Sequence, residues 1–219
     1  MLKRLSRSIR YRLGMHVVAP ALEAGTDEGV VTYYNSRPSR CCFLQDPEHY
    51  ERPRIEWILD TVKGGRLLEI GCADGGVSEL LAKCVASLVA LDVCEASITE
   101  LLARRLPNVE ARVGLAESFE PEGRFDWIVM SELLEHVREP ERLVARALGW
   151  LAPGGRLLAS TPEGQWEGDS IEHLHVFDLE SWTRLFARAG AHSLRAFKIP
   201  DGRGRDRWLG ADVTASESA

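Results

Sequence analysis

The sequence predicts an α/β fold in which helices cover both faces of a doubly wound, parallel sheet. Three observations support this prediction. Short apolar runs that end in glycine or an acidic residue alternate with segments of helical periodicity. The hydrophobic fraction of 45% is ordinary for a folded domain and supplies a large core. The 219 residues suit one α/β domain with a small additional segment better than two domains.

The alternation begins after a polar, proline-containing lead-in over residues 35–53. We expect a first helix over 53–62, which Gly64 and Gly65 terminate. The predicted elements that follow are strand 66–70, helix 76–85, strand 88–91, helix 96–106, strands 109–113 and 125–130, helix 140–150, strand 156–160 and helix 179–189. Pro153-Gly154-Gly155 is expected to form the turn before the fifth strand. Such an order implies right-handed crossovers between parallel strands.

The chain divides into an N-terminal cap or lead-in over 1–52, one domain over 53–214 and a frayed tail over 215–219. The first 22 residues contain several Lys and Arg and no acid, with apolar residues at helical spacing. A solvated capping helix, a helix in weak contact with a membrane surface and an organelle transit peptide all remain open for this segment. No apolar run is long enough to predict a transmembrane span.

Charge and cysteine content bear on partners and compartment. The net charge of −6 disfavours a broad nucleic-acid-binding surface. The five cysteines are odd in number and form no CxxC pair, which fits a reducing cytoplasm better than a disulfide framework. We therefore expect a cytoplasmic protein without a nucleic-acid partner, and the oligomeric state stays open.

The connection between the first strand and its helix is rich in glycine. It reads Glu69-Ile70-Gly71-Cys72-Ala73-Asp74-Gly75-Gly76. Glycines let a backbone bend tightly and approach a ligand, and ligands of doubly wound sheets bind at the carboxyl ends of the strands. Asp92 ends the next strand, where a carboxylate can accept hydrogen bonds from both hydroxyls of a ribose. These features alone allow either a dinucleotide or another adenosine-containing cofactor.

Two residues favour S-adenosylmethionine over NAD. A dinucleotide fingerprint requires glycine at position 73, where this chain has Ala73. Glu69 precedes the turn, where an acid repels a pyrophosphate but pairs with the α-amino group of a methionine.

The run 68–75 resembles the first motif of class I S-adenosylmethionine-dependent methyltransferases, although position 73 is commonly glycine in that family. Segments 115–117, 125–131 and 151–157 are similar to later motifs of the family, in the expected order across residues 55–190. The resemblance implies a Rossmann-like, mainly parallel seven-stranded sheet in a three-layer αβα sandwich. In the family an antiparallel hairpin closes the sheet; 192–199 can be one of its strands, but 208–214 is a poor second strand.

The resemblance also implies which residues bind the cofactor. Glu69 and Gly71 are expected at the methionine part and Asp92 at the ribose; the cofactor-binding set also includes the loop residues Cys72, Ala73 and Gly75. The remaining expected contacts are the packing of Val93 on adenine, Ala116 and Glu117 near the adenine amino group, and Ser131 on the floor below the sulfonium.

A dense polar cluster follows the fourth strand. If this segment is helical, Glu132, Glu135 and His136 share one face, where they can bind a divalent cation or form a base with an orienting partner. The string resembles the Glu-x-x-Glu-His signature of ubiquinone-pathway O-methyltransferases and of small-RNA terminal 2′-O-methyltransferases, both of which use a magnesium-type ion.

Three interpretations of this cluster stay open. The first is a metal site formed by Glu132, Glu135, His136 and His175, with an ion such as Mg²⁺. The second is a structural role. The third is general-base catalysis by His136, with Glu135 and His173 as further catalytic residues.

The predicted function is methyl transfer to a hydroxyl or amine of a small molecule, such as a sugar, a quinone precursor or a secondary metabolite. The alternatives are a terminal RNA 2′-O-methyltransferase, a non-catalytic scaffold with a methyltransferase fold, and an NAD-dependent oxidoreductase. The acceptor is expected near residues 33–35 and the loop 161–175, where Trp166 either stacks on a ring or belongs to the core.

Overall fold

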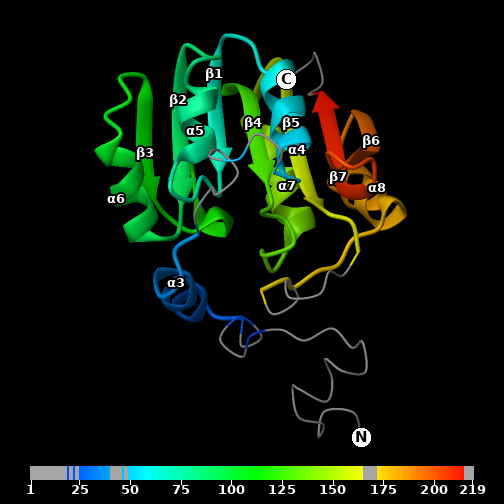
Figure 1. Cartoon of the computed structure of the whole chain (residues 1–219), viewed down its shortest axis with the longest axis horizontal. Coiled ribbons are helices and arrows are strands. Elements are labelled where there is room, and N and C mark those ends of the chain that lie inside the picture. The colour runs from blue at the N-terminus through cyan, green and yellow to red at the C-terminus, as the bar shows by residue number, and fades with distance from the viewer. Residues whose placement is uncertain are drawn as a thin grey trace, which may run out of the picture.

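A computed structural model describes residues 19, 22, 25–39, 46, 49–164 and 172–214. The centre is a seven-stranded sheet in the order β3-β2-β1-β4-β5-β7-β6 (Figure 1). Strand β7 pairs antiparallel with β5 and β6, and the other pairs are parallel. The strands are β1 Arg66–Ile70, β2 Ser87–Asp92, β3 Val109–Val113, β4 Phe125–Ser131, β5 Leu151–Pro162, β6 Ser193–Pro200 and β7 Asp206–Thr214. The predicted mainly parallel, seven-stranded α/β fold is confirmed.

Helices cover both faces of this sheet. The helices are α3 Asp27–Asn35, α4 Arg52–Thr61, α5 Gly76–Leu81, α6 Glu95–Ala103, α7 Pro140–Trp150 and α8 Leu179–Arg188, with a short 3₁₀ turn at Ala116–Ser118. Apolar residues of α4, α5 and α6 form one core with one face of the strands, and those of α7 and α8 form a second core with the other face. Leu67 and Leu68 of β1 enter opposite cores because successive strand side chains alternate.

The interpretation of 208–214 as a poor strand is wrong. Strand β7 pairs along its length with both β5 and β6. Gly210 weakens the sequence pattern, but a Cβ there would lie only 2.7 Å from Cζ of Phe197, so this position needs the smallest residue. Asp212, which also weakens the pattern, forms an ion pair with Arg156. Both apparent defects are therefore satisfied by neighbouring strands.

The Pro-Gly-Gly turn expected before the fifth strand lies inside β5. The pairing of β4 with β5 jumps from Phe125 opposite Leu151 to Trp127 opposite Arg156, and Gly154 has φ +73°. The extra residues are accommodated as an irregularity of the strand. Helix α5 also ends earlier than predicted, at Leu81.

Helix α3 lies beyond the carboxyl ends of the parallel strands (Figure 1). The Thr26 side chain caps it by accepting a hydrogen bond from the Gly29 amide at 3.1 Å. Most of the basic N-terminal stretch, Arg40, Trp166 and the tail 215–219 fall outside the described residues. Within the described part of the chain, no helix has both the length and the apolar character needed to cross a bilayer.

Candidate active site

A cavity of about 550 Å³ opens at the carboxyl ends of β1, β2 and β4. Its lining includes thirteen of the fifteen residues expected at the site; Gly75 and His175 do not line it. Further lining residues come from α3, α4 and β7, namely Tyr34, Arg54 and Trp208. The site thus combines the strand ends of the sheet with helices that precede them in the chain.

The glycine-rich connection forms a tight turn at one end of this cavity. Gly71 and Gly75 have φ values of +82° and +78°, a backbone region that favours glycine. Gly75 packs against α6, where a Cβ would lie 2.4 Å from Cδ1 of Leu101. Gly75 therefore shapes the turn, and its predicted contact with a cofactor stays a prediction. Ala73 also adopts a positive φ, of +47°, at the position where the family commonly has glycine.

Asp92 holds this turn from the end of β2. Its carboxylate accepts hydrogen bonds from the amides of Ala73 and Cys94, each at 2.8 Å and each at a different oxygen. Burial raises the pKa of Asp92, and the backbone hydrogen bonds oppose that shift. Each oxygen keeps a second lone pair, so the carboxylate retains the capacity to accept ribose hydroxyls.

Glu69 is a buried acid directly before the turn. It is 3% exposed, and its carboxylate accepts a hydrogen bond from the Ser78 hydroxyl at 2.5 Å. Burial raises the pKa of Glu69 to about 8, the Ser78 hydrogen bond lowers it and the nearby Asp92 raises it. A carboxyl group held in this way becomes a favourable carboxylate when a cation binds beside it.

The segment after β3 also contributes to the lining of the cavity. Ala116 and Glu117 lie in the short 3₁₀ turn. The Glu117 carboxylate accepts a hydrogen bond from the Arg138 amide at 3.3 Å. Val93 is half-buried, and its carbonyl accepts a hydrogen bond from the side chain of Asn35 at 3.3 Å. These residues lie where an adenine contact was predicted, and that contact stays a prediction.

Arg54 is a site residue that sequence reasoning missed. Its side chain is 4% exposed; the guanidinium bonds to the Ser131 hydroxyl, pairs with Glu51 at 2.8 Å and lies over the Trp208 ring. Ser131 also bonds to Ser160 at 3.0 Å. The sequence did carry a signal, because Arg54 precedes the buried Ile58 by one helical turn and so places a charge on the apolar side of α4.

The segment after β4 is not helical. It forms a series of turns, and Glu132 takes a positive φ of +56°. The expected shared helical face of Glu132, Glu135 and His136 is therefore wrong. Glu132 lies instead 3.8 Å from Nε of Arg54.

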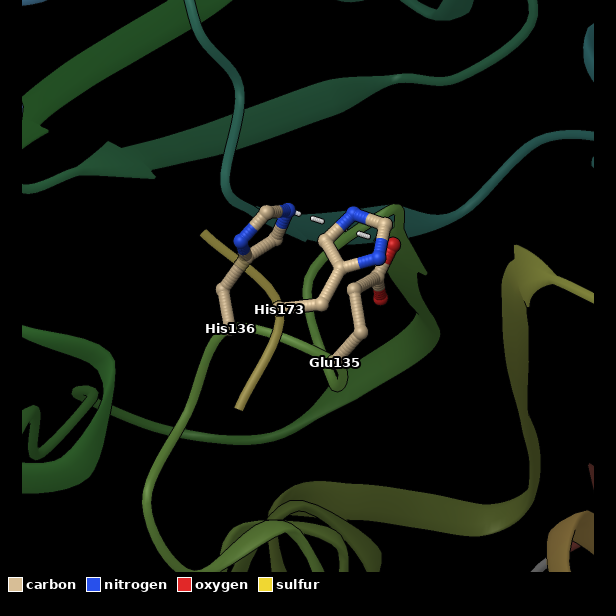
Figure 2. Close-up of side chains that lie close together, drawn as sticks. All are labelled: Glu135, His136 and His173. Carbon is tan, nitrogen blue, oxygen red and sulfur yellow. Dashed lines mark ion pairs between the residues drawn. The ribbon is translucent and has the colours of Figure 1, made fainter. Parts of the chain in front are cut away.

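Glu135 and His136 converge with His173, which comes from a separate segment after β5 (Figure 2). One potential ligand atom from each of the three residues lies within 4.8 Å of the others. Nε2 of His136 is 3.9 Å from Oε1 of Glu135, and the two imidazole rings are 5.0 Å apart. The Glu135 carbonyl accepts the amides of Leu174 and His175, which fixes the second segment against the turn.

The tentative metal set is not assembled. Nε2 of His175 bonds to the Val137 carbonyl at 2.9 Å, outside the cavity lining. The chain bends at Leu174, so the two histidines point in different directions. The cluster is therefore Glu135, His136 and His173, and it contains neither Glu132 nor His175.

Helix α3 closes the far side of the cluster. The Tyr34 hydroxyl is 3.2 Å from Nδ1 of His136, and the Glu172 carbonyl is 3.1 Å from the same nitrogen. The Tyr33 hydroxyl donates to the Glu172 carboxylate at 3.0 Å. The expectation that residues 33–35 lie beside the site agrees with these contacts.

Comparison with known proteins identifies the family. A family model described as a methyltransferase domain matches residues 44–194. The ubiquinone biosynthesis O-methyltransferase of Azotobacter vinelandii is 30% identical over 162 residues, which are 70% of this chain and 68% of that protein. For further curated relatives of the same name the chain covers between 52% and 64% of their length.

Solved structures share the fold at low sequence identity. The N-methyltransferase NodS from Bradyrhizobium japonicum, in complex with S-adenosylhomocysteine, has a TM-score of 0.66 and 20% identity, covering 85% of this chain and 98% of that one. The 1,6-didemethyltoxoflavin-N1-methyltransferase of Burkholderia thailandensis, with 1,6-didemethyltoxoflavin and S-adenosylhomocysteine bound, has a TM-score of 0.68 and 18% identity. It covers 97% of this chain and 92% of that one.

Proposed function

The chain belongs to the methyltransferase domain family, class I and S-adenosylmethionine-dependent, and on that premise we propose that it methylates a hydroxyl or amine of a small molecule. One observation carries this proposal. A single cavity unites the turn with Glu69 and Asp92 at one end and the Glu135–His136–His173 cluster at the other. A donor and an acceptor can therefore meet inside one enclosed space, as an in-line displacement requires.

The donor end fits an amino acid joined to a nucleoside. Glu69 would pair with the α-amino group, and the backbone of the turn from Gly71 to Ala73 would contact the methionine part. Asp92 would accept the ribose hydroxyls, and Val93, Ala116 and Glu117, which line the same cavity, would hold the adenine. S-adenosylmethionine supplies an already activated methyl group on a sulfonium, so these residues mainly bind and orient.

Arg54 completes the donor end. Its Nε makes no hydrogen bond to any part of the chain that the structure describes, although the guanidinium is almost fully buried. Ser131, below the expected methyl group, bonds to the same guanidinium. We assign Arg54 to the α-carboxylate of the cofactor, where a planar guanidinium is well suited to two parallel hydrogen bonds.

The acceptor end supplies a base. Nε2 of His136 would take the proton of an acceptor hydroxyl as its oxygen attacks, or would first remove the proton of an ammonium so that the free amine attacks. The new bond to the methyl carbon would form as the carbon–sulfur bond of the sulfonium breaks, and the neutral thioether S-adenosylhomocysteine would leave. The Glu135 carboxylate, 3.9 Å away, stabilises the resulting imidazolium, and His173 shapes the wall against which the acceptor lies.

The acceptor class is proposed as a small molecule. The name of the Azotobacter relative refers to ubiquinone biosynthesis, and the Burkholderia enzyme has a small heterocycle bound. The net charge of −6 gives no support to an RNA acceptor. A scaffold without activity has no need for a polar cluster facing the cofactor end of a cavity.

A divalent cation at the cluster is the second candidate, favoured by three potential ligand atoms within 4.8 Å. Two imidazoles and one carboxylate suit a transition metal, whereas Mg²⁺ prefers oxygen ligands. The magnesium-type ion therefore fits this donor set poorly. Turnover that survives extensive chelation supports His136 as a metal-free base, and loss restored by Mn²⁺, Fe²⁺ or Zn²⁺ supports the metal.

We also propose a reducing cytoplasmic location, supported among the described residues by the free thiols of Cys84 and Cys94. Weak contact between the basic N-terminus and a membrane surface stays a prediction, because residues 1–18 lie outside the described part of the chain.

Binding and acceptor screening test the function. The protein is titrated calorimetrically with S-adenosylhomocysteine and with NAD, then incubated with S-adenosylmethionine and a panel of phenols, sugars, amines and short RNAs. Mass spectrometry then reads the gain of a methyl group. We expect binding of S-adenosylhomocysteine and methylation of a small molecule. Binding of NAD alone, or methylation of RNA alone, would refute the proposal.

A variant pair tests the base. We expect His136→Asn to lower kcat by about 10²- to 10⁴-fold with S-adenosylhomocysteine affinity retained. The matched control is His192→Asn, because His192 is exposed and does not line the cavity. Equal turnover of the two variants would remove His136 from the mechanism.

A further inference from the structure

Two contacts at Nδ1 bear on which nitrogen of His136 carries a proton. The Glu172 backbone carbonyl lies 3.1 Å from Nδ1, and the Tyr34 hydroxyl lies 3.2 Å from the same atom. A carbonyl oxygen has lone pairs and no proton, so it can only accept a hydrogen bond. A neutral imidazole with a lone pair on Nδ1 would place two lone pairs against each other. The contact therefore requires a proton on Nδ1.

We propose that Tyr34 is a positioning residue that, together with the Glu172 carbonyl, holds His136 in its Nδ1–H tautomer with the Nε2 lone pair facing the acceptor. This inference rests on the proposed function for the importance of Nε2. The arrangement itself exists in the protein without any acceptor.

Tyr34 and Glu172 reach His136 from different parts of the chain. Tyr34 stands near the end of α3, before the sheet begins, and Glu172 stands after β5. The ring of Tyr34 meets the ring of His136 edge to face, at 6.1 Å between centroids. Both oxygens lie within hydrogen-bond distance of Nδ1, so in the proposed tautomer they can share its single proton in a three-centre hydrogen bond. The imidazole is thereby fixed in rotation as well as in tautomer.

The opposite ring nitrogen faces the rest of the cluster. Nε2 lies 3.9 Å from the Glu135 carboxylate, and the His173 ring stands at 79° to that of His136 (Figure 2). The Glu172 carboxylate is engaged elsewhere, by the Tyr33 hydroxyl at 3.0 Å and by Arg37 at 3.8 Å. Only its backbone carbonyl acts on Nδ1.

The Tyr34 hydroxyl remains a neutral phenol in this position. Burial raises the pKa of Tyr34, and the acids Glu172, Glu135 and Glu117 raise it further. A neutral hydroxyl can accept a share of the Nδ1 proton without adding charge beside the imidazole. Phenylalanine at this position would keep the ring and remove only this oxygen.

The test compares two hydroxyl deletions in the same helix. Full-length wild type, Tyr34→Phe and Tyr33→Phe are labelled with ¹⁵N at histidine, and the ring nitrogens of His136 are assigned with the His136→Asn spectrum as reference. We expect the wild type to show a protonated Nδ1 and a lone pair on Nε2. Tyr34→Phe should raise the fraction of the other tautomer clearly more than Tyr33→Phe, which removes a hydroxyl that bonds to the Glu172 carboxylate.

Kinetics provide the second measurement. With an acceptor found by the screen, Tyr34→Phe should lower kcat by about two- to tenfold, the loss expected for one neutral hydrogen bond. The KM for the cofactor and the affinity for S-adenosylhomocysteine should stay at wild-type values, which also reports that the variant is folded. A merely structural loss would lower the affinity and kcat together.

Three outcomes would overturn the inference: a wild-type His136 protonated on Nε2 alone, an unchanged tautomer ratio in Tyr34→Phe, or the same change in both variants. An equal change in both variants would mean that the tautomer responds to a displacement of α3 and not to the Tyr34 hydroxyl. The tautomer is read without acceptor or turnover, so it can be established even if His136→Asn retains activity and the proposed base fails.

Discussion

The substitution Glu69→Gln removes a buried carboxyl group while conserving its shape. Glu69 is 3% exposed, and its pKa is raised to about 8, chiefly by burial. In the protein without cofactor, about nine-tenths of the molecules therefore hold this group protonated at pH 7. Pairing with the α-amino group of the cofactor requires the carboxylate, so binding should release a proton below pH 8.

The effects of pH and of Glu69→Gln on ligand affinity follow from the pKa of Glu69 and from its expected bond to the ligand. The affinity of the wild type for S-adenosylhomocysteine should rise by about tenfold per pH unit up to pH 8 and then level off. At pH 8 the glutamine variant should bind about 10- to 100-fold more weakly, because a hydrogen bond to a charged group contributes about 1.5–3 kcal/mol. Its affinity should lose the dependence on pH over this range.

The folding stability of the protein without cofactor should fall as pH rises, whereas the affinity for the ligand should rise. The folded-state pKa of about 8 exceeds the ordinary value of 4.5, so the folded protein binds more protons than the unfolded chain between these limits. The unfolding free energy should therefore fall as pH rises from 4.5 to 8, by up to about 5 kcal/mol from this group alone. Glu69→Gln should remove that slope.

Calorimetric titration between pH 6 and 9, with chemical unfolding over pH 5 to 8, measures both effects. Glu110→Gln is the matched control, because Glu110 is exposed on β3. Methylthioadenosine, which lacks the amino-acid part, is the control ligand, and its affinity should not depend on residue 69. If Glu69→Gln bound S-adenosylhomocysteine with the affinity and the pH dependence of the wild type, the assignment of Glu69 to the α-amino group would be refuted.

Four further substitutions, one of them a control, test the turn and the donor end. Gly75→Ala should lower the unfolding free energy by about 1–3 kcal/mol in urea unfolding, because of its positive φ and its contact with Leu101. Gly149→Ala, in α7 with open space around the new Cβ, should raise it by about 0.5–1 kcal/mol, and equal results for the two would contradict this account. Asp92→Asn should weaken both S-adenosylhomocysteine and methylthioadenosine by at least about tenfold, since an amide nitrogen cannot accept a backbone N–H. Arg54→Lys should weaken S-adenosylhomocysteine by about tenfold and spare methylthioadenosine, and weakening of both ligands would count against a carboxylate contact.

The sequence predicted which residues gather at the strand ends around the cavity, because its signals there are local. The turn after β1, Asp92 at the end of β2 and the later motifs lie at strand ends, and the parallel sheet brings all such ends to one edge. Ala73 departed from the family pattern, yet it adopts the positive φ that a glycine would take there. The weak pattern of β7 misled because Gly210 and Asp212 are satisfied only by neighbouring strands.

By itself the sequence determined the α/β fold, the glycine turn and the acids at the ends of β1 and β2, since each follows from a short run of residues and its periodicity. The tertiary structure decided the acceptor end. A positive φ at Glu132 turns that acid towards Arg54, and the bend at Leu174 selects His173 over His175. Tyr34 meets His136 across 102 positions of chain. Such contacts depend on how separate segments pack, which a local pattern of residues does not specify.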